Sequence, residues 1–289
     1  PLECGGVAGR LAFELAKRSD LKIIAVDSDP ASVERARKHL MEAGLYGSRV
    51  MVFHAEPDTG ACPEYFADLV VSGRSVTEGS AGTLQSDAAR YMRPCGGIAC
   101  IGEPGAMDVK VRGSLAGAGE WTHQYHDPGN TVFSTDDLVR GNLGVLWYRD
   151  PDYTMPSRHG RAVSPLYGDG RLFVQGLHGV RAHNAYDGRV LWEYYIEDVQ
   201  KANDQDTHLG TNLTQSNWCL GNDRLYIRTE DAEGSPFDRY CVVLDAATGG
   251  FVRKIAPPRI SGSDTWGYIA VDNGIIFGSV VADNRQLEF

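Results

Sequence analysis

The distribution of apolar and polar residues divides the chain into two parts with different periodicities. The first part holds apolar runs of strand length at 22–27, 49–55, 67–73 and 96–103. Between the first two runs, apolar residues from Val33 to Ala43 recur at helical spacing, with Asp29 as the expected N-cap. Continuous apolar strands that alternate with helices are typical of a parallel sheet covered on both faces. The first part is therefore predicted to be a Rossmann-like α/β domain.

The second part lacks helical periodicity and contains an internal repeat. GDGRLFV (168–174) recurs as GNDRLYI (221–227) and more loosely as DNGIIFG (272–278), and NAYDGRVLW (184–192) recurs as DAATGGFVR (245–253). The repeat length of roughly 50 residues matches one four-stranded propeller blade. A β-sandwich with accidental similarity is the alternative, but two motifs recurring in the same register favour an all-β partial β-propeller.

The domain organisation follows from these patterns. We expect an α/β domain at 1–112, a small-residue linker at 113–120 and about three incomplete blades at 121–289. Propellers close with about four to eight blades, so the expected partners are the remaining blades and domains of a longer polypeptide. Pro1 and Leu2 read as the end of a strand that begins earlier.

Charge and cysteine content narrow the possible partners. The 289-residue chain has a formal net charge of -10, which argues against nucleic acid or an anionic membrane as the main partner. No apolar run approaches the roughly 18 residues of a membrane span. None of the six cysteines forms a C-x-x-C pair, and Cys219 could pair with Cys241 in an exported protein.

The stretch LECGGVAGR (2–10) has the composition of a nucleotide-binding turn between a strand and a helix. As a nicotinamide fingerprint it reads C-x-G-x-x-G, with Gly6 and Gly9 in place. As an S-adenosylmethionine loop it reads E-x-G-x-x-x-G, with Glu3, Gly5 and Gly9 in place and Val7 at the middle glycine. Asp27 ends the next strand, where an acid can bind ribose hydroxyls.

The motifs that follow favour the second reading. IIAVDSDPASVERARKHL, FHAEP, FADLVVSG and ARYMRPCGGIACIGEP resemble, in order, the motifs of class I S-adenosylmethionine-dependent methyltransferases over residues 2–104. The resemblance implies that Glu3, Gly5 and Gly9 line the methionine side of the cofactor, that Asp27 binds the ribose, and that Glu56 lies near the adenine. Val7 and the missing last two strands of that family predict a vestigial domain.

The second part resembles the blades of quinoprotein-like (PQQ-type) propellers, which carry A-x-D-x-x-T-G-x-x-x-W. Matching residues are Ala182, Ala185, Gly188 and Trp192 in one copy, and Asp245, Ala246, Thr248 and Gly249 in the next. Arg253 replaces the second tryptophan. That family includes quinone-dependent alcohol dehydrogenases and propellers that bind no quinone, and the adjacent cysteine pair of the dehydrogenases is missing. PQQ is therefore not expected within this stretch.

The combination of both parts resembles large bacterial PQQ-like repeat proteins, in which an α/β module lies beside or within the propeller. Such proteins are often exported, and some carry cytochrome c domains. The resemblance implies a periplasmic or otherwise exported location, whereas genuine S-adenosylmethionine binding would imply the cytoplasm.

The segment WTHQYHDPGNT (121–131) carries the candidate catalytic residues. His123, His126 and Asp127 could meet His159 as metal ligands or as acid–base groups. On an extended segment, His-x-x-His does not place both rings on one face, so no metal site is predicted. The alternative is that Trp121, His126 and Asp127 fasten the linker to the first blade, with a turn at 127–130. His208 and Trp218 are predicted to be hydrogen-bonded groups on blade edges.

Three hypotheses about the function remain open. The sequence also leaves open whether the protein is an enzyme. The main hypothesis is a scaffold or binding protein in which a vestigial methyltransferase-like domain packs on the propeller. A small molecule is a possible ligand of that protein. The first alternative is an active methyltransferase whose propeller presents the substrate. The second alternative is part of a quinoprotein-type or electron-transfer oxidoreductase whose redox centre lies elsewhere.

Overall fold

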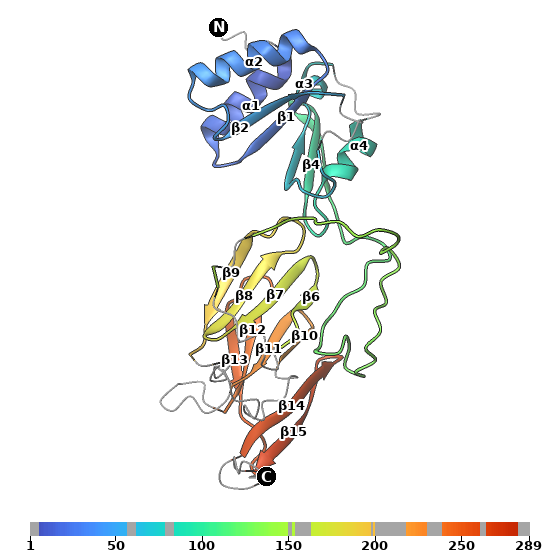
Figure 1. Ribbon diagram of the computed structural model, residues 1–289, viewed down its shortest axis with the longest axis vertical. Helices are drawn as coiled ribbons and strands as arrows, with labels where there is room; N and C mark the ends of the chain where they lie inside the picture. Colours follow the sequence, from blue (N-terminus) through green and yellow to red (C-terminus); the bar gives the residue numbers. More distant parts are fainter. Residues whose placement is uncertain are drawn as a thin grey trace. The chain divides into compact units, whose positions relative to one another are not determined.

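A computed structural model gives the fold of the chain, which divides into two compact units, Pro1–Ser114 and Leu115–Phe289 (Figure 1). The residues that the structure describes are 6–56, 62–78, 84–149, 152–153, 163–197, 199, 218–229, 239–260 and 264–282. The division falls inside the predicted linker. In the described part of the chain, no helix is long and apolar enough to cross a membrane.

The first unit alternates helices and strands. Its elements are α1 (Gly6–Arg18), β1 (Ile23–Asp27), α2 (Pro30–Glu42), β2 (Val50–His54), β3 (Leu69–Val71), α3 (Gly73–Glu78), α4 (Leu84–Tyr91), β4 (Ile98–Glu103) and β5 (Ala106–Val111). Strands β1 to β4 fall within the four predicted runs.

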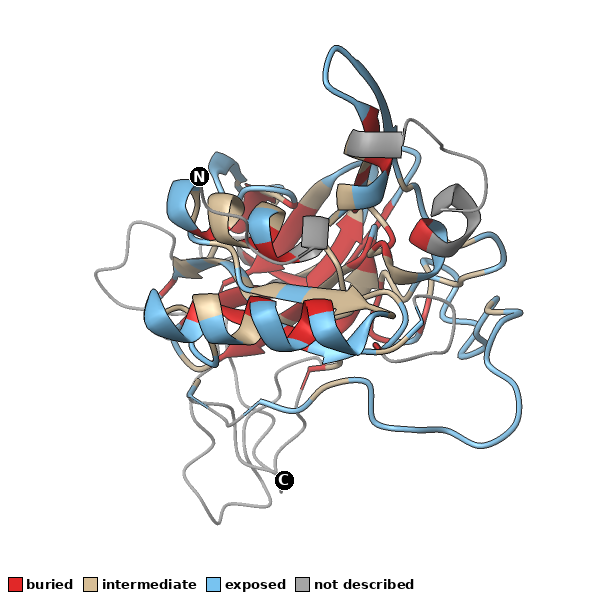
Figure 2. Cartoon of the chain, turned by 90° about the horizontal axis from the view of Figure 1, so that it is seen from above, coloured by how far each residue is buried: buried red, intermediate tan, exposed pale blue. Residues whose placement is uncertain are grey.

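Helix α2 forms as its sequence predicts. The Asp29 carboxylate accepts hydrogen bonds from the amides of Ala31 and Ser32, which otherwise have no partner in the first turn. Val33 and Leu40 lie on the buried side and pack with β2 in one hydrophobic cluster, while the opposite side of the helix is exposed. Figure 2 shows this division of helices into a buried and an exposed side.

Among residues 6–56, 62–78 and 84–114, the predicted single parallel sheet is not observed. Strands β1 and β2 form one two-stranded parallel sheet, and β3–β4–β5 form a second sheet in which β5 runs antiparallel to β4. Several large apolar strand side chains are more than a third exposed, among them Ile24, Met51 and Phe53. A sheet covered by helices on both faces would bury these side chains, so the Rossmann-like expectation is not supported.

The second unit is all-β. Its strands are β6 (Leu166–Gly168), β7 (Arg171–Gly176), β8 (Gly179–Asn184), β9 (Val190–Tyr195), β10 (Trp218–Gly221), β11 (Arg224–Arg228), β12 (Cys241–Asp245), β13 (Phe251–Ile255), β14 (Asp264–Asp272) and β15 (Ile275–Ala282). They form two four-stranded antiparallel sheets, β6–β7–β8–β9 and β10–β11–β12–β13, and the two-stranded sheet β14–β15. This arrangement is consistent with a partial β-propeller.

The internal repeat is confirmed by the turns that join the first two strands of each sheet. Asp169 and Gly170, Asn222 and Asp223, and Asn273 and Gly274 occupy equivalent positions, and all six residues have positive φ between 47° and 78°. Two successive residues with positive φ form the hairpin turn that matches the twist of antiparallel strands. The repeated motifs therefore predict the positions of all three hairpins correctly.

The sheets of the second unit are joined by shared hydrophobic clusters. One cluster includes Phe173 and Val180 of the first sheet with Leu225 and Leu244 of the second. Another contains Cys219 and Cys241 of the second sheet with Trp266 of the third. Cys219 lies on β10 and Cys241 on β12, with β11 between them. Strands two places apart are separated by about 10 Å, beyond the roughly 7 Å reach of a disulfide, and both thiols are free.

A tryptophan–glycine contact also joins the two four-stranded sheets. Trp192 in the fourth strand, β9, donates its indole N–H to the carbonyl of Ala246 in the next sheet at 3.1 Å. Gly249 lies against the indole at φ 72°, so close that a methyl group there would overlap the ring. Trp147 makes the same contact with Ala185 (2.8 Å) and Gly188.

Candidate functional site

Residues 120–131, here called the crossing segment, contact the first strand of each of the three sheets in the second unit, namely β6, β10 and β14. The backbone of Trp121 exchanges two hydrogen bonds with Tyr167 of β6, at 2.9 and 2.8 Å. The next carbonyl, that of Thr122, accepts from the amide of Leu220 in β10 at 2.8 Å. The segment thus occupies backbone groups on strand edges that would otherwise be open to a ligand.

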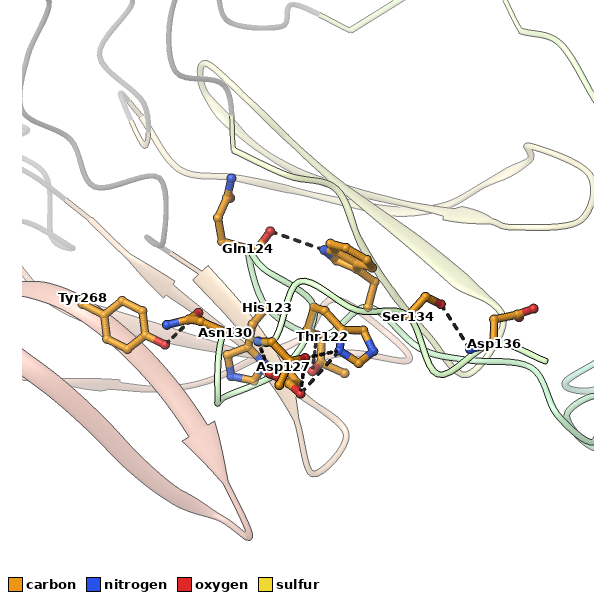
Figure 3. A network of polar contacts seen from close by, with 11 residues as sticks. Thr122, His123, Gln124, Asp127, Asn130, Ser134, Asp136 and Tyr268 are labelled. Carbon is orange, nitrogen blue, oxygen red and sulfur yellow. Dashed lines mark hydrogen bonds and ion pairs between the residues drawn. The ribbon is translucent and has the colours of Figure 1, made fainter. Parts of the chain in front are cut away.

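His123 connects the crossing segment to the third sheet. Its Nε2 accepts a hydrogen bond from the amide of Val271 in β14 at 3.1 Å, so the ring hydrogen is on Nδ1, which donates to the Thr122 hydroxyl at 2.8 Å. The side chain is 2% exposed, and burial lowers the pKa of His123 to about 4. His123 is therefore neutral at neutral pH, with both ring nitrogens hydrogen-bonded. Figure 3 shows His123 beside Thr122 in the crossing segment.

The expectation that His-x-x-His lies on an extended segment is wrong. His123 and His126 face each other across a tight turn, in which each accepts a hydrogen bond from the other's amide at 3.1–3.2 Å. His126 has φ 84°, and its buried ring makes an edge-to-face contact with the ring of Trp121 at a centroid distance of 5.3 Å. The two rings nevertheless have different partners.

His126 and Asp127 share one threonine. Asp127 accepts from the amide and the hydroxyl of Thr131, at 3.0 and 2.8 Å, and these bonds hold the pKa of Asp127 below its usual range. The Thr131 hydroxyl in turn accepts from His126 Nδ1 at 3.1 Å. Because the hydroxyl hydrogen is directed at the carboxylate, His126 does not deprotonate Thr131, and the trio lacks the geometry of an activated nucleophile.

The remaining predictions for this segment have mixed outcomes. The turn at 127–130 is confirmed, since the amide of Asn130 donates to the carbonyl of Asp127 at 3.0 Å. Trp218 donates its indole N–H to the carbonyl of Ser164 at 3.1 Å, as predicted for a blade-edge group. His159 and His208 lie outside the described residues. Sequence reasoning missed Thr122 and Thr131, although threonine beside histidine is a common hydrogen-bond partner.

A pocket of about 410 Å³ opens beside the crossing segment. It is lined by the rings of Trp121, Tyr167 and Tyr186 and by the carboxylates of Glu120 and Asp136. Asp136 is ionised, because amide hydrogen bonds hold its pKa below the usual range. The lining contains no lysine or arginine. The lining is mostly apolar, since it also includes Leu115, Ala118, Leu138 and Val139, and its two ionisable residues are both acidic.

The residues predicted to bind S-adenosylmethionine are only partly assembled. Glu3 and Gly5 lie outside the described residues, while Gly6 begins α1 and Gly9 is buried within it. Asp27 is the last residue of β1 and Glu56 follows the end of the parallel strand β2, so both lie at the carboxyl ends of these strands. Asp27 Oδ1 accepts from the amide of Asp29 at 2.9 Å, and Glu56 is exposed. These residues form no enclosed cofactor site among those described.

Comparisons with known proteins give only partial structural matches. No protein-family model matches the chain, and no curated protein matches it. Among solved structures, a quinohemoprotein alcohol dehydrogenase from Pseudomonas putida HK5 is 21% identical over 55% of this chain, with a TM-score of 0.36. A europium-containing methanol dehydrogenase is 14% identical over 56%, with a TM-score of 0.35.

The chain spans only 22% and 27% of the lengths of these two structures. Neither is described as a methyltransferase, and the methyltransferase resemblance of residues 2–104 finds no support in any comparison. The vestigial-methyltransferase hypothesis and the S-adenosylmethionine assignment therefore stay predictions without support from the comparisons.

Proposed function

We propose that residues 115–289 form structural blades, here called the propeller wall, of a quinoprotein-type oxidoreductase. The redox centre of that protein lies outside the described residues. The observation that carries this proposal is the repeated tryptophan–glycine contact. In the blade motif that the sequence resembles, the tryptophan packs between neighbouring blades. Here Trp192 packs on Gly249 and Trp147 on Gly188, each with the indole N–H bonded to a carbonyl of the neighbouring turn.

A role in the wall, and not in the redox centre, follows from the side chains of the crossing segment. His123 has both ring nitrogens bonded within the fold. Asp127 accepts two hydrogen bonds from Thr131, which lower its pKa and so make it a weaker base for a substrate proton. The residues that resembled catalytic groups therefore stabilise the arrangement of the sheets.

The pocket beside the crossing segment does not fit PQQ. PQQ is a flat quinone that carries several carboxylate groups, so its site requires cationic or metal-bound partners. The pocket beside the crossing segment presents the carboxylates of Glu120 and Asp136 and no basic side chain. Repulsion between like charges excludes a polyanion there. Any quinone in the whole protein is bound by other residues.

The experiment compares two proteins. The full polypeptide is purified from its native source, and its absorbance spectrum is recorded before and after addition of a primary alcohol. We expect quinone or haem bands that change on reduction, and alcohol-dependent reduction of an electron-accepting dye. The matched control is the 289-residue chain incubated with PQQ and Ca²⁺, which should emerge from gel filtration without quinone absorbance.

A native polypeptide with neither quinone nor haem bands would contradict the redox role and favour a binding scaffold. Stoichiometric PQQ on the 289-residue chain would contradict the assignment of these residues to the wall. The proposal also implies an exported protein, as the family resemblance does, and cell fractionation tests it. Recovery of the native polypeptide in the cytoplasmic fraction would count against that location.

A further inference from the structure

Two segments that approach each other closely form the walls of the pocket beside the crossing segment. The amide of Asp137 donates to the carbonyl of Gly117 at 2.8 Å, and the amide of Gly119 donates to Asp136 Oδ2 at 3.0 Å. The contact is so close that a methyl group on Gly119 would overlap the backbone of Asp136. These bonds fix the walls within the fold, so the pocket is formed before any ligand binds.

Three aromatic residues contribute to the lining. Their polar groups are bonded within the fold, since the indole N–H of Trp121 donates to the carbonyl of Gln124 at 3.4 Å and the hydroxyls of Tyr167 and Tyr186 share a hydrogen bond at 3.2 Å. Aromatic rings attract cations through the negative potential of their faces. The volume of about 410 Å³ falls within the range of small-molecule sites, which is roughly 300–1,000 Å³.

Glu120 supplies an anionic oxygen that the fold does not use. Its Oε1 accepts a hydrogen bond from the amide of Asp169 at 3.2 Å, whereas Oε2 accepts none from the residues that the structure describes. The second carboxylate, that of Asp136, accepts from three backbone amides. The lining, all of it described, contains no lysine or arginine. A positively charged ligand would therefore complement both carboxylates.

We infer that this pocket binds a small organic cation, and specifically a protonated primary amine with an apolar body. The ammonium group donates a hydrogen bond to Glu120 Oε2 and is attracted by the aromatic rings, while the apolar body contacts Ala118 and Leu138. A quaternary ammonium has no N–H and cannot use that oxygen. The site holds whether or not the whole protein is an oxidoreductase.

The test compares four ligands of similar size on the natural 289-residue chain by isothermal titration calorimetry. They are 2-phenylethylamine, the neutral 2-phenylethanol, the quaternary 2-phenylethyl-trimethylammonium and the anionic 3-phenylpropionate. We expect the amine to bind most tightly and each of the others to bind about tenfold more weakly or worse. The alcohol lacks the charge, the quaternary cation lacks the N–H, and the anion is repelled.

Glu120→Gln tests the role of the unused oxygen. The amide keeps an oxygen for the amide of Asp169 but removes the negative charge, so binding of 2-phenylethylamine should weaken by about ten- to hundredfold. Glu34→Gln, at an exposed residue of α2 in the first unit, changes the net charge equally and is the matched control. Urea unfolding followed by tryptophan fluorescence checks that Glu120→Gln is folded. The comparison of ligands on the natural chain requires no variant.

Each other outcome overturns the inference. Absence of binding at millimolar 2-phenylethylamine, or equal affinity for the amine and the alcohol, shows that the pocket does not select a cation. Tighter binding of the quaternary cation contradicts the hydrogen bond to Glu120. Equal affinities of Glu120→Gln and Glu34→Gln for the amine show that the amine binds elsewhere or responds to net charge alone.

Discussion

At the scale of single residues, His123 illustrates how a histidine in a promising motif becomes a structural group. Its Nε2 accepts from the amide of Val271, and an imidazolium would present a second hydrogen to that amide. Burial adds to the cost of charging the ring. Protonation therefore breaks the connection between the crossing segment and the third sheet.

We predict that the second unit loses stability as the pH falls from about 6.5 to about 4 because of His123. The pKa of His123 is about 4 in the folded state and near 6.5 when unfolded, so the unfolded state binds the extra proton in this range and stability falls with it. The loss amounts to about 3 kcal/mol at most. All five tryptophans lie in the second unit, so urea unfolding followed by tryptophan fluorescence reports on that unit alone.

The control for this prediction is His123→Gln, which keeps a hydrogen-bonding side chain but has no titrating group. Its stability at neutral pH should be lower than that of the natural chain, and its pH dependence between 6.5 and 4 should be flatter. Parallel pH profiles for the two proteins would show that His123 does not titrate in this range. His126→Gln distinguishes the two histidines, because it leaves the bond to Val271 in place.

A second residue-scale prediction concerns Gly249. Gly249→Ala places a methyl group against the indole of Trp192 at a residue with φ 72°, whereas Gly274→Ala has a similar φ of 78° and no atom closer than 3.8 Å. The left-handed backbone costs each variant about 1–2 kcal/mol. The overlap adds about 1–3 kcal/mol to Gly249→Ala alone. Equal losses in the two variants, measured by urea unfolding, would show that the tryptophan contact does not constrain Gly249.

At the scale of elements, the sequence patterns predicted the local structure well. Helix α2 begins after Asp29 as its capping pattern indicates, and three Gly, Asn or Asp turns mark three hairpins. Such features depend on neighbouring residues alone, which is why sequence reasoning finds them. The motif ending in Trp192 likewise predicted the contact with the next sheet, because it specifies both the glycine and the tryptophan.

The long-range arrangement was not predictable from the same patterns. The crossing segment contacts β6 and β10 through backbone groups that every residue carries, so no residue type indicates these two contacts, and it contacts β14 through the side chain of His123. In the first unit, apolar strands such as β1 and β2 indicated a covered parallel sheet, yet Ile24 and Phe53 remain exposed. Apolar periodicity shows which side chains favour burial, but it does not identify what covers them.

At the scale of the whole molecule, each hydrophobic cluster draws its residues from one unit. Leu40 belongs to a cluster formed by α1, α2, β1, β2 and the turn after α2, whereas Leu244 belongs to the cluster between the first two sheets of the second unit. Cooperative unfolding requires that the unfolding of one region destabilises another. Among the described residues no cluster contains residues of both units, so each unit has a hydrophobic core of its own.

We therefore predict that Leu40→Ala destabilises the first unit by about 2–5 kcal/mol and leaves the second unit unchanged. Leu40 is 1% exposed, so its truncation leaves a cavity among Val33, Val50 and their neighbours. The urea midpoint of far-UV circular dichroism at helical wavelengths should fall, because the helices lie in the first unit. The midpoint of tryptophan fluorescence should stay constant.

Leu244→Ala is the matched control and should lower the fluorescence midpoint alone. A shift of both midpoints in either variant would mean that the two units unfold together, and stability effects measured by tryptophan fluorescence would then belong to the whole chain.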